Sequence, residues 1–255
     1  IQVAVAALIT GILGPVDSVA IVGRPPIDLG LFAWPLTVLW IVGLTNAFNF
    51  VDGSDGMAGL GAVVVGACVT ILGLRLGAHP PMLLAAFLTA AAGGFLVFNW
   101  HPARIFMGDV GSGFLGMFLA TLPLLFPEPV RPVVFLPIAL CLWPFIYDPL
   151  LSVPRRVWNG KNPFEPHREF LFHRLLRSGA THAQAALLYG LLAALGGLAG
   201  LSMLDQRLPA WVRLLLPAVV ILMAACLTWG IERRCAAGSM TPAEGANLPG
   251  PQIGR

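Results

Sequence analysis

Long apolar runs separated by short polar connections form the main pattern of this chain. A helix needs about 17–25 predominantly apolar residues to cross a lipid bilayer, and eight runs come close to that length. They cover approximately residues 1–16, 31–47, 57–76, 81–98, 112–127, 132–151, 184–204 and 208–230. We therefore expect an all-α polytopic membrane protein with about eight transmembrane helices.

The composition also indicates a membrane protein. Apolar residues make up 57% and charged residues 11% of the 255 residues, whereas soluble domains average about 25% charged residues. The mean hydropathy of +0.83 over this length argues against a soluble protein with one buried core. The net charge of +3 is too small to indicate a nucleic acid partner. Three of the four cysteines lie inside apolar runs, and none has paired spacing, which favours small core residues over metal or redox roles.

The ends of the sequence carry weaker signals. It opens with Ile1-Gln2-Val3, which has neither an initiator methionine nor the charged n-region of a signal peptide. We expect the natural N-terminus to lie upstream, so that residues 1–235 form a single transmembrane domain without its N-terminal part. Residues 236–255, rich in Gly, Pro and Ala, are expected to be a disordered tail. Residues 17–30 predict a short extracytoplasmic hairpin.

Alternation of the helices assigns each polar connection to one side of the membrane. Connections 46–56, 99–111 and 152–183 share a side with the C-terminal tail. That side carries ten of the 15 Lys and Arg residues, and the other side carries five. The excess of positive charge predicts that the first side is cytoplasmic. The three motifs described next therefore all face the cytoplasm.

The first motif combines two carboxylates and two amides at the end of an apolar run. It is Asn46-Ala-Phe-Asn49-Phe-Val-Asp52-Gly53-Ser-Asp55-Gly56. Such groups are costly at a membrane helix end unless they are paired or solvated. Their oxygens suit a divalent cation, or the hydroxyls and base edge of a nucleotide, and the glycines permit close backbone approach. The alternative is a polar helix cap with an Asx turn, which needs only one such residue.

The second motif brings an acid to the start of an apolar helix. It runs from Asn99 through Phe106 to Gly108-Asp109-Val-Gly111-Ser112. Mg²⁺ is usually held by one or two carboxylates while substrate phosphates complete its coordination. Ser112 and the amides of the glycine-rich turn suit phosphate oxygens, and Phe106 is placed to stack on a base. The alternative role for Asp109 is to cap the helix that begins near residue 112.

The third motif is a basic loop over residues 154–179. Its candidate substrate ligands are Arg155, Arg156, His167, Arg168 and His173. For Arg155 and Arg156 an equal alternative is membrane topology or attraction to anionic lipid. Attraction to anionic lipid would not require histidine. We therefore expect His167, Arg168 and His173 to bind a diphosphate.

A helix from Pro166 to Gly179 is predicted within this loop. It would place four apolar residues opposite three cationic ones, as in an interfacial amphipathic helix. The apolar group is Leu171, Phe172, Leu175 and Leu176, and the cationic group is His173, Arg174 and Arg177. Phe170 departs from the pattern because it falls on the cationic side. Asp148, near the same membrane face, is a functional candidate by default or a partner for Arg155 or Arg156.

Together, the three motifs resemble one family, the bacterial polyprenyl-phosphate N-acetylhexosamine-1-phosphate transferases of glycosyltransferase family 4. The matching stretches are NAFNFVDGSDGMAG, FNWHPARIFMGDVGSGFLG and NPFEPHREFLFHRLLRSGATH. The resemblance implies a bacterial inner-membrane enzyme with a cytoplasmic active site. The enzyme would transfer an (N-acetyl)hexosamine 1-phosphate from a UDP-sugar to undecaprenyl (polyprenyl) phosphate and release UMP. Its cofactor would be Mg²⁺, with Mn²⁺ as an alternative, and a homodimer is left open.

The resemblance also implies roles for individual residues. Asp109 would be the metal ligand, and Asn49 and Asp52 would lie in the nucleotide site with Asp55 beside them. Phe106 would stack on the uracil, and the His/Arg loop would bind the diphosphate and sugar. Taken with the chemistry above, the catalytic candidates are Asp52, Asp55, Asp109, His167 and His173. The substrate-binding candidates are Asn46, Asn49, Asn99, Phe106, Ser112, Arg155, Arg156 and Arg168.

Two departures from the family pattern change the expectations. Family members carry an Asp-Asp pair upstream of the first motif, and this sequence has none, so we expect the chain as given to be inactive by itself. The His-x-His-His run of the N-acetylglucosamine-specific relatives is replaced here by Phe170-Leu171-Phe172-His173, which leaves the donor sugar open. The loop is closer to enzymes that initiate O-antigen, a part of lipopolysaccharide, with modified N-acetylated sugars.

Two rival functions remain. A transporter would carry charges near the bilayer midplane and two repeated halves with interrupted helices, but the acids here gather at one face and no repeat is visible. A non-catalytic lipid-binding fragment is the second rival. Release of UMP from a UDP-sugar separates the enzyme from both.

Overall fold

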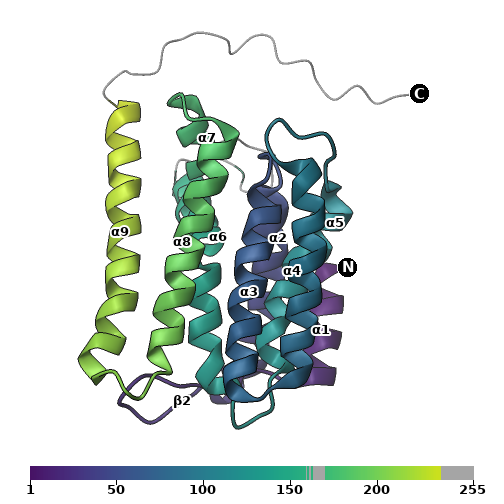
Figure 1. Ribbon diagram of the computed structural model, residues 1–255, viewed down its shortest axis with the longest axis vertical. Helices are drawn as coiled ribbons and strands as arrows, with labels where there is room; N and C mark the ends of the chain where they lie inside the picture. Colours follow the sequence, from purple (N-terminus) through teal and green to yellow (C-terminus); the bar gives the residue numbers. More distant parts are fainter. Residues whose placement is uncertain (159, 161, 163–169, 237–255) are drawn as a thin grey trace.

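Helices running side by side make up nearly all of the computed structural model (Figure 1). It describes residues 1–158, 160, 162 and 170–236. In chain order the α-helices are α1 Gln2–Leu13, α2 Ala33–Val51, α3 Met57–Leu76, α4 His79–Asn99, α5 Gly108–Thr121, α6 Arg131–Trp158, α7 Leu171–Arg177, α8 His182–Met203 and α9 Ala210–Ala236. Two short 3-10 helices, η1 Gly30–Phe32 and η2 Leu122–Leu125, extend α2 and α5.

Seven of the described helices are long and apolar enough to cross a membrane. The protein is therefore an all-α polytopic membrane protein, as the sequence predicts. The first predicted span, 1–16, corresponds to α1, which has 12 residues and at 1.5 Å per residue is too short to cross a bilayer. The predicted tail lies outside the described residues apart from Ala236, which ends α9.

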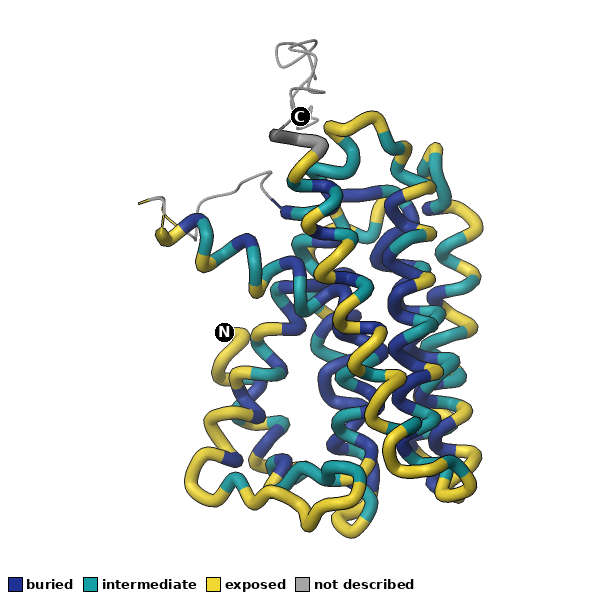
Figure 2. The backbone as a smooth tube through the Cα atoms, turned by 90° about the vertical axis from the view of Figure 1, so that its left-hand side faces the viewer, coloured by how far each residue is buried: buried dark blue, intermediate teal, exposed yellow. Residues whose placement is uncertain are grey.

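Figure 2 shows the buried positions between the helices and the exposed positions on the outside of the bundle. Many exposed side chains are large and apolar, among them Leu39, Phe87, Val97, Leu198 and Leu222. Large exposed apolar surfaces are rare on soluble proteins. This outer surface is the one that membrane lipid would cover.

Glycines allow the closest helix contacts in the bundle. A Cβ on Gly116 of α5 would lie 2.7 Å from the Leu44 carbonyl oxygen and 2.9 Å from the Phe48 Cβ, both in α2. On α8, Gly196 meets the backbone of Leu140, and Gly200 meets the backbone of Pro137, both in α6. Small residues of this kind let membrane helices approach each other closely, since burial of apolar surface does little to hold them together in lipid.

The two ends of the bundle differ in their connections. At one end, β1 (Ser18–Val19) and β2 (Ile27–Asp28) pair antiparallel, which confirms the predicted hairpin. Arg131 is buried at this end and donates hydrogen bonds to the carbonyls of Leu13, Pro15 and Leu124. The opposite end carries α7 (Figure 1) and the connections that hold the three motifs.

Candidate active site

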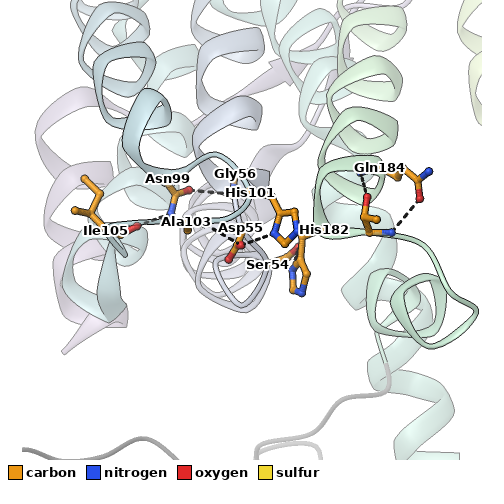
Figure 3. A network of polar contacts seen from close by, with 10 residues as sticks. Ser54, Asp55, Gly56, Asn99, His101, Ala103, Ile105, His182 and Gln184 are labelled. Carbon is orange, nitrogen blue, oxygen red and sulfur yellow. Dashed lines mark hydrogen bonds and ion pairs between the residues drawn. The ribbon is translucent and has the colours of Figure 1, made fainter. Parts of the chain in front are cut away.

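Side-chain contacts join three connections at the end of the bundle that carries α7 (Figure 3). The Nδ1 atom of His101, between α4 and α5, lies 2.8 Å from Oδ2 of Asp55, between α2 and α3. The Ala103 N–H donates to the same oxygen at 3.2 Å. The Ser54 hydroxyl and Nδ1 of His182, the first residue of α8, form a 3.1 Å hydrogen bond. The motif-bearing connections therefore share one end of the molecule, as predicted.

The carboxylate of Asp55 is stabilised in its ionised form by these neighbours. Its partial burial by itself favours the protonated form. The hydrogen bonds from His101 and Ala103, with His182 nearby, outweigh burial and hold the pKa of Asp55 below its usual 3.8. The rings of His101 and His182 are stacked, with centroids 5.4 Å apart. Through these hydrogen bonds, Asp55 holds the connection after α2 against the connection before α5.

The buried side chain of Asn99 also links the α2–α3 connection to the α4–α5 connection. Its Oδ1 accepts the Gly56 N–H at 3.0 Å, and its Nδ2 donates to the Ile105 carbonyl at 2.9 Å. Gly56 has φ of +73°, and a Cβ there would lie 3.2 Å from the Trp100 ring. Only glycine fits this position without strain. Asn99 thus holds the turn that contains Asp52 and Asp55, and it has almost no surface left for a substrate.

Asp52 and Asp109 lie close enough to repel each other. Asp52 ends α2, and Asp109 stands in the first turn of α5. Burial and the negative charge of Asp109 raise the pKa of Asp52 from 3.8 to about 6, against the opposing effect of the Gly108 N–H. The N-cap residue of α5 is Met107, and no side chain caps this helix. The capping role considered for Asp109 is therefore not observed.

Asn49 and Ser112 form a second link between α2 and α5. The Ser112 hydroxyl donates to Oδ1 of Asn49 at 2.8 Å and also contacts the Gly108 carbonyl at 3.1 Å. Ser112 is fully buried, and its contact with phosphate oxygens stays a prediction. Its physical role here is to orient Asn49, which is half-buried one turn before Asp52.

The remaining residues of the first two motifs occupy different surroundings. Asn46 donates to the Gln2 side chain at 3.0 Å and to the Val42 carbonyl at 2.8 Å, so its amide joins α2 to α1. Phe106 is 74% exposed and precedes Asp109 by three residues, which leaves its ring accessible for stacking.

The third motif is described only in part. His167 and Arg168 lie outside the described residues. Arg155 pairs with Glu232 of α9, and Arg156 is buried and donates from Nε to the Asn162 carbonyl at 2.7 Å. These contacts are structural and do not test either arginine as a substrate ligand.

The predicted helix 166–179 is observed from Leu171, and the chain turns at Gly179, where φ is +96°. Phe170 does not fall on a cationic side, because it precedes the helix with an extended backbone. It is buried, and its ring stacks on Phe50 of α2 with centroids 4.9 Å apart. The ring of His173 lies 6.0 Å from that of Phe170. Two aromatic contacts thus connect His173 to the end of α2 that carries Asp52.

The donor set fits a magnesium ion that is shared with a substrate. Among the described residues, no three His, Cys, Asp or Glu side chains come together as a metal site. The negative charge of Asp109 contributes to the raised pKa of Asp52, and a bound cation would offset the charge of both carboxylates. Mg²⁺ is typically bound by one or two carboxylates together with substrate phosphates and water, which matches this pair.

His101 and His182 were not among the predicted site residues. His101 stands inside the second motif, two residues after Asn99, and His182 opens α8. The signal that could have found them is the presence of an imidazole in a short connection at the same membrane face as the acids. Their common partner, the Ser54–Asp55 turn, is separated from His182 by more than a hundred residues and appears only in the folded chain.

The fold and the site together define a polytopic membrane protein with an acidic, amide-lined site at one end of its helices. The sequence model of Glycosyl transferase family 4 matches residues 1–126, which contain both Asp52 and Asp109. The chain belongs to this family, and the resemblance seen in its motifs is confirmed.

Three relatives with assigned names are similar to part of this chain. "Probable undecaprenyl-phosphate N-acetylglucosaminyl 1-phosphate transferase" of Bacillus subtilis is 38% identical over 63% of this chain and 45% of its own length. "Decaprenyl-phosphate N-acetylglucosaminephosphotransferase" of Mycolicibacterium smegmatis is 36% identical over 60% and 43%. "Phospho-N-acetylmuramoyl-pentapeptide-transferase" of Streptococcus uberis is 36% identical over 42% and 32%. The matched part of the chain spans less than half the length of each relative.

Proposed function

We propose that the protein transfers an (N-acetyl)hexosamine 1-phosphate from a UDP-sugar to undecaprenyl (polyprenyl) phosphate and releases UMP. This step would initiate a cell-envelope polysaccharide such as O-antigen. The names of the relatives support the reaction class, since each describes the transfer of a phosphorylated N-acetyl sugar, with a pentapeptide attached in one case. The membrane-spanning helices support a lipid acceptor, because its prenyl chain would remain in the bilayer beside the site.

One observation carries the proposal. Asp52, directly after α2, and Asp109, in the first turn of α5, lie at the same polar end of the bundle, where the charge of Asp109 contributes to the raised pKa of Asp52. Proteins rarely keep two repelling carboxylates together at a membrane surface unless a cation or substrate needs them. A diphosphate donor brings both the negative oxygens and the need for a divalent cation.

The chain's own residues would bind and orient the donor. Asp109 and Asp52 would hold Mg²⁺, which when bound neutralises charge on the transferring phosphates. Asn49, fixed by Ser112, offers its amide NH₂ group to donor hydroxyls or to the base, and Phe106 offers its ring to the uracil. His173 would contribute a donor to the diphosphate. His167 and Arg168 remain predicted ligands of the same groups. Since a phosphate acceptor is already ionised at neutral pH, no strong general base is required.

The orientation in the membrane follows from charge. We infer a bacterial inner-membrane location with the Asp52–Asp109 end in the cytoplasm, where UDP-sugars are made. The charge asymmetry between the two sets of connections supports this orientation.

The test is release of UMP by the intact protein, as its gene encodes it, in detergent or nanodiscs with a UDP-sugar, undecaprenyl phosphate and Mg²⁺. Asp109→Asn is expected to lower the rate by at least about 100-fold, since metal stabilisation of transition-state charge is worth several kcal/mol. Asp28→Asn makes the same chemical change in the hairpin at the opposite end and is the matched control.

Removal of divalent cations with EDTA should stop the reaction, and Mg²⁺ or Mn²⁺ should restore it. A panel of UDP-linked sugars then identifies the donor. Metal-independent UMP release, or Asp109→Asn with more than a third of the wild-type rate, would remove Asp109 as metal ligand. Absence of UMP release from every donor with the intact protein would favour the transporter or the lipid-binding alternative.

A further inference from the structure

Asp148 is a buried carboxylate inside α6, a helix that spans the membrane. Only 1% of its surface is exposed. A charged or polar group at such a position is costly unless hydrogen bonds replace its water. The sequence allows two roles for Asp148: a functional residue, or a partner for Arg155 or Arg156. The described contacts give it no arginine partner, because Arg155 pairs with Glu232 and the hydrogen bonds of Asp148 come from elsewhere.

Four donors from three helices converge on this carboxylate. The Leu171 N–H lies 2.6 Å from Oδ1, and the Phe172 N–H lies 3.3 Å from Oδ2. The Tyr189 hydroxyl of α8 donates to Oδ2 at 2.7 Å, and the Ser152 hydroxyl, one turn along α6, donates to Oδ1 at 3.0 Å. Both carboxylate oxygens are therefore used, and each one binds the first turn of α7.

The helix α7 depends on contacts of this kind for its position. It has seven residues, and isolated helices shorter than about 12 residues are marginal in water. The free N–H groups of a helix start need acceptors, and a carboxylate also interacts favourably with that end of the helix dipole. No side chain within α7 or at its N-cap provides a cap, so Asp148 supplies the acceptor from a different helix.

The first turn of α7 also sets the location of His173. Phe172 is fully buried, and its ring centroid lies 3.9 Å from that of His173. Phe170, directly before the helix, stacks on Phe50 of α2. A shift of Leu171 and Phe172 would therefore move His173 relative to the turn that contains Asp52.

We propose that Asp148 is a positioning residue of the active site: it holds the first turn of α7 so that His173 faces the donor phosphates beside Asp52. This inference rests on the proposed function for the role of His173. The anchoring of α7 by Asp148 is a separate physical claim with its own measurement. Asp148 itself touches no substrate, so its effect on the reaction passes through α7.

The kinetic test compares Asp148→Asn, His173→Ala and the double variant in the intact protein. The asparagine side chain would keep one acceptor oxygen but present an NH₂ group where a donor now points. The expected loss in kcat for Asp148→Asn is at least about tenfold, with an unchanged KM for undecaprenyl phosphate. In the His173→Ala background, the same substitution should cost less than about threefold more, because residues that act through one another are not additive.

Hydrogen–deuterium exchange tests the anchor without any activity. In Asp148→Asn, the peptide covering residues 170–177 should exchange at least about tenfold faster, while peptides from 190–203 of α8 stay unchanged. Ser152→Ala is the matched variant, because it removes one donor to Asp148 and leaves both bonds to α7. Its 170–177 peptide should exchange within about threefold of the wild-type rate.

The outcomes separate the two claims. Unchanged exchange in 170–177 for Asp148→Asn would overturn the anchor. Faster exchange with multiplicative losses in the double variant, or a wild-type kcat, would overturn the positioning of His173. If the wild-type protein released no UMP from any donor, the proposed function would fail, and the exchange data alone would decide the anchor.

Discussion

At Asp52 the folded chain changes the chemistry of a single carboxyl group. Its surroundings combine partial burial with the nearby charge of Asp109, and the two effects bring its pKa to about 6. Asp55, three residues later, has the opposite shift because His101 and the Ala103 N–H stabilise its ionised form. The sequence presents these two acids as equivalents. Their neighbours distinguish the two acids: Asp52 lies within the influence of Asp109, whereas Asp55 links the connection after α2 to the connection before α5.

The raised pKa of Asp52 predicts a pH-dependent cost to stability. A carboxyl whose pKa is higher in the folded state than in the unfolded state destabilises the fold above the folded value, and the cost fades as pH falls from about 6 to 4. Without divalent cations at pH 7.5, Asp52→Asn should raise the unfolding temperature by roughly 2–4 °C, the shift for about 1 kcal/mol after solvent screening.

The measurement is thermal unfolding in detergent with EDTA at pH 7.5 and pH 4.5. At pH 4.5 the difference between wild type and Asp52→Asn should largely vanish. A variant less stable than the wild type at pH 7.5, or an equal difference at both values, would contradict the assigned repulsion.

At the scale of elements, the pairing of α2 with α5 forms the site. The helix α2 carries Asn49 and is followed directly by Asp52, and α5 carries Asp109 and Ser112. At Gly116 the backbone of α5 lies against Leu44, Thr45 and Phe48 of α2, so we expect the separation of Asp52 and Asp109 to depend on this residue. Close packing at a small residue is the main means by which membrane helices fix their separation.

Gly116→Ala is expected to push α5 away from α2. An added Cβ would meet the Leu44 carbonyl oxygen at 2.7 Å, and overpacking of this kind costs about 1–3 kcal/mol. Both the unfolding temperature and the rate of UMP release should fall. Gly113→Ala, one turn earlier in α5, is the control because a Cβ there meets nothing within 4 Å. Equal behaviour of the two variants would show that the contact does not set the site.

At the scale of the whole molecule, the two ends of the bundle have different tasks. One end gathers the acids, amides and histidines from connections far apart in the chain. The opposite end is tied together by the β1–β2 hairpin and by Arg131, whose guanidinium satisfies three backbone carbonyls. A planar group with several fixed donors suits that role, and a lysine could not reproduce it.

The proposed orientation predicts which end a membrane-impermeant thiol reagent can reach. Arg24, in the hairpin, and Arg104, beside the site, are both exposed. With the native cysteines replaced by alanine, Arg24→Cys should be labelled in intact cells and Arg104→Cys only after the cytoplasmic membrane is permeabilised. The cysteine-free parent controls for background. Labelling of Arg104→Cys from outside would reverse the orientation and remove the cytoplasmic active site.

The sequence by itself determined the class of protein, the family and most of the helices. The run predicted at 57–76 has the same bounds as α3. The hairpin predicted within 17–30 is present as β1 and β2. These features depend on local properties: the length of an apolar run, a turn residue, or the order of residues in a motif. Such properties are readable because each involves neighbours in the chain.

Only the tertiary structure decided which of the polar candidates form contacts that hold the protein together. Ser112 and Asn99 look like ligands in the sequence, yet both are buried and bonded to other parts of the site. The role of Asp148 depends on the hydrogen bonds that it accepts from Leu171, Phe172 and Tyr189, up to 41 residues away. A hydrogen bond is settled by distance and direction in space, and those are fixed only when the helices have packed.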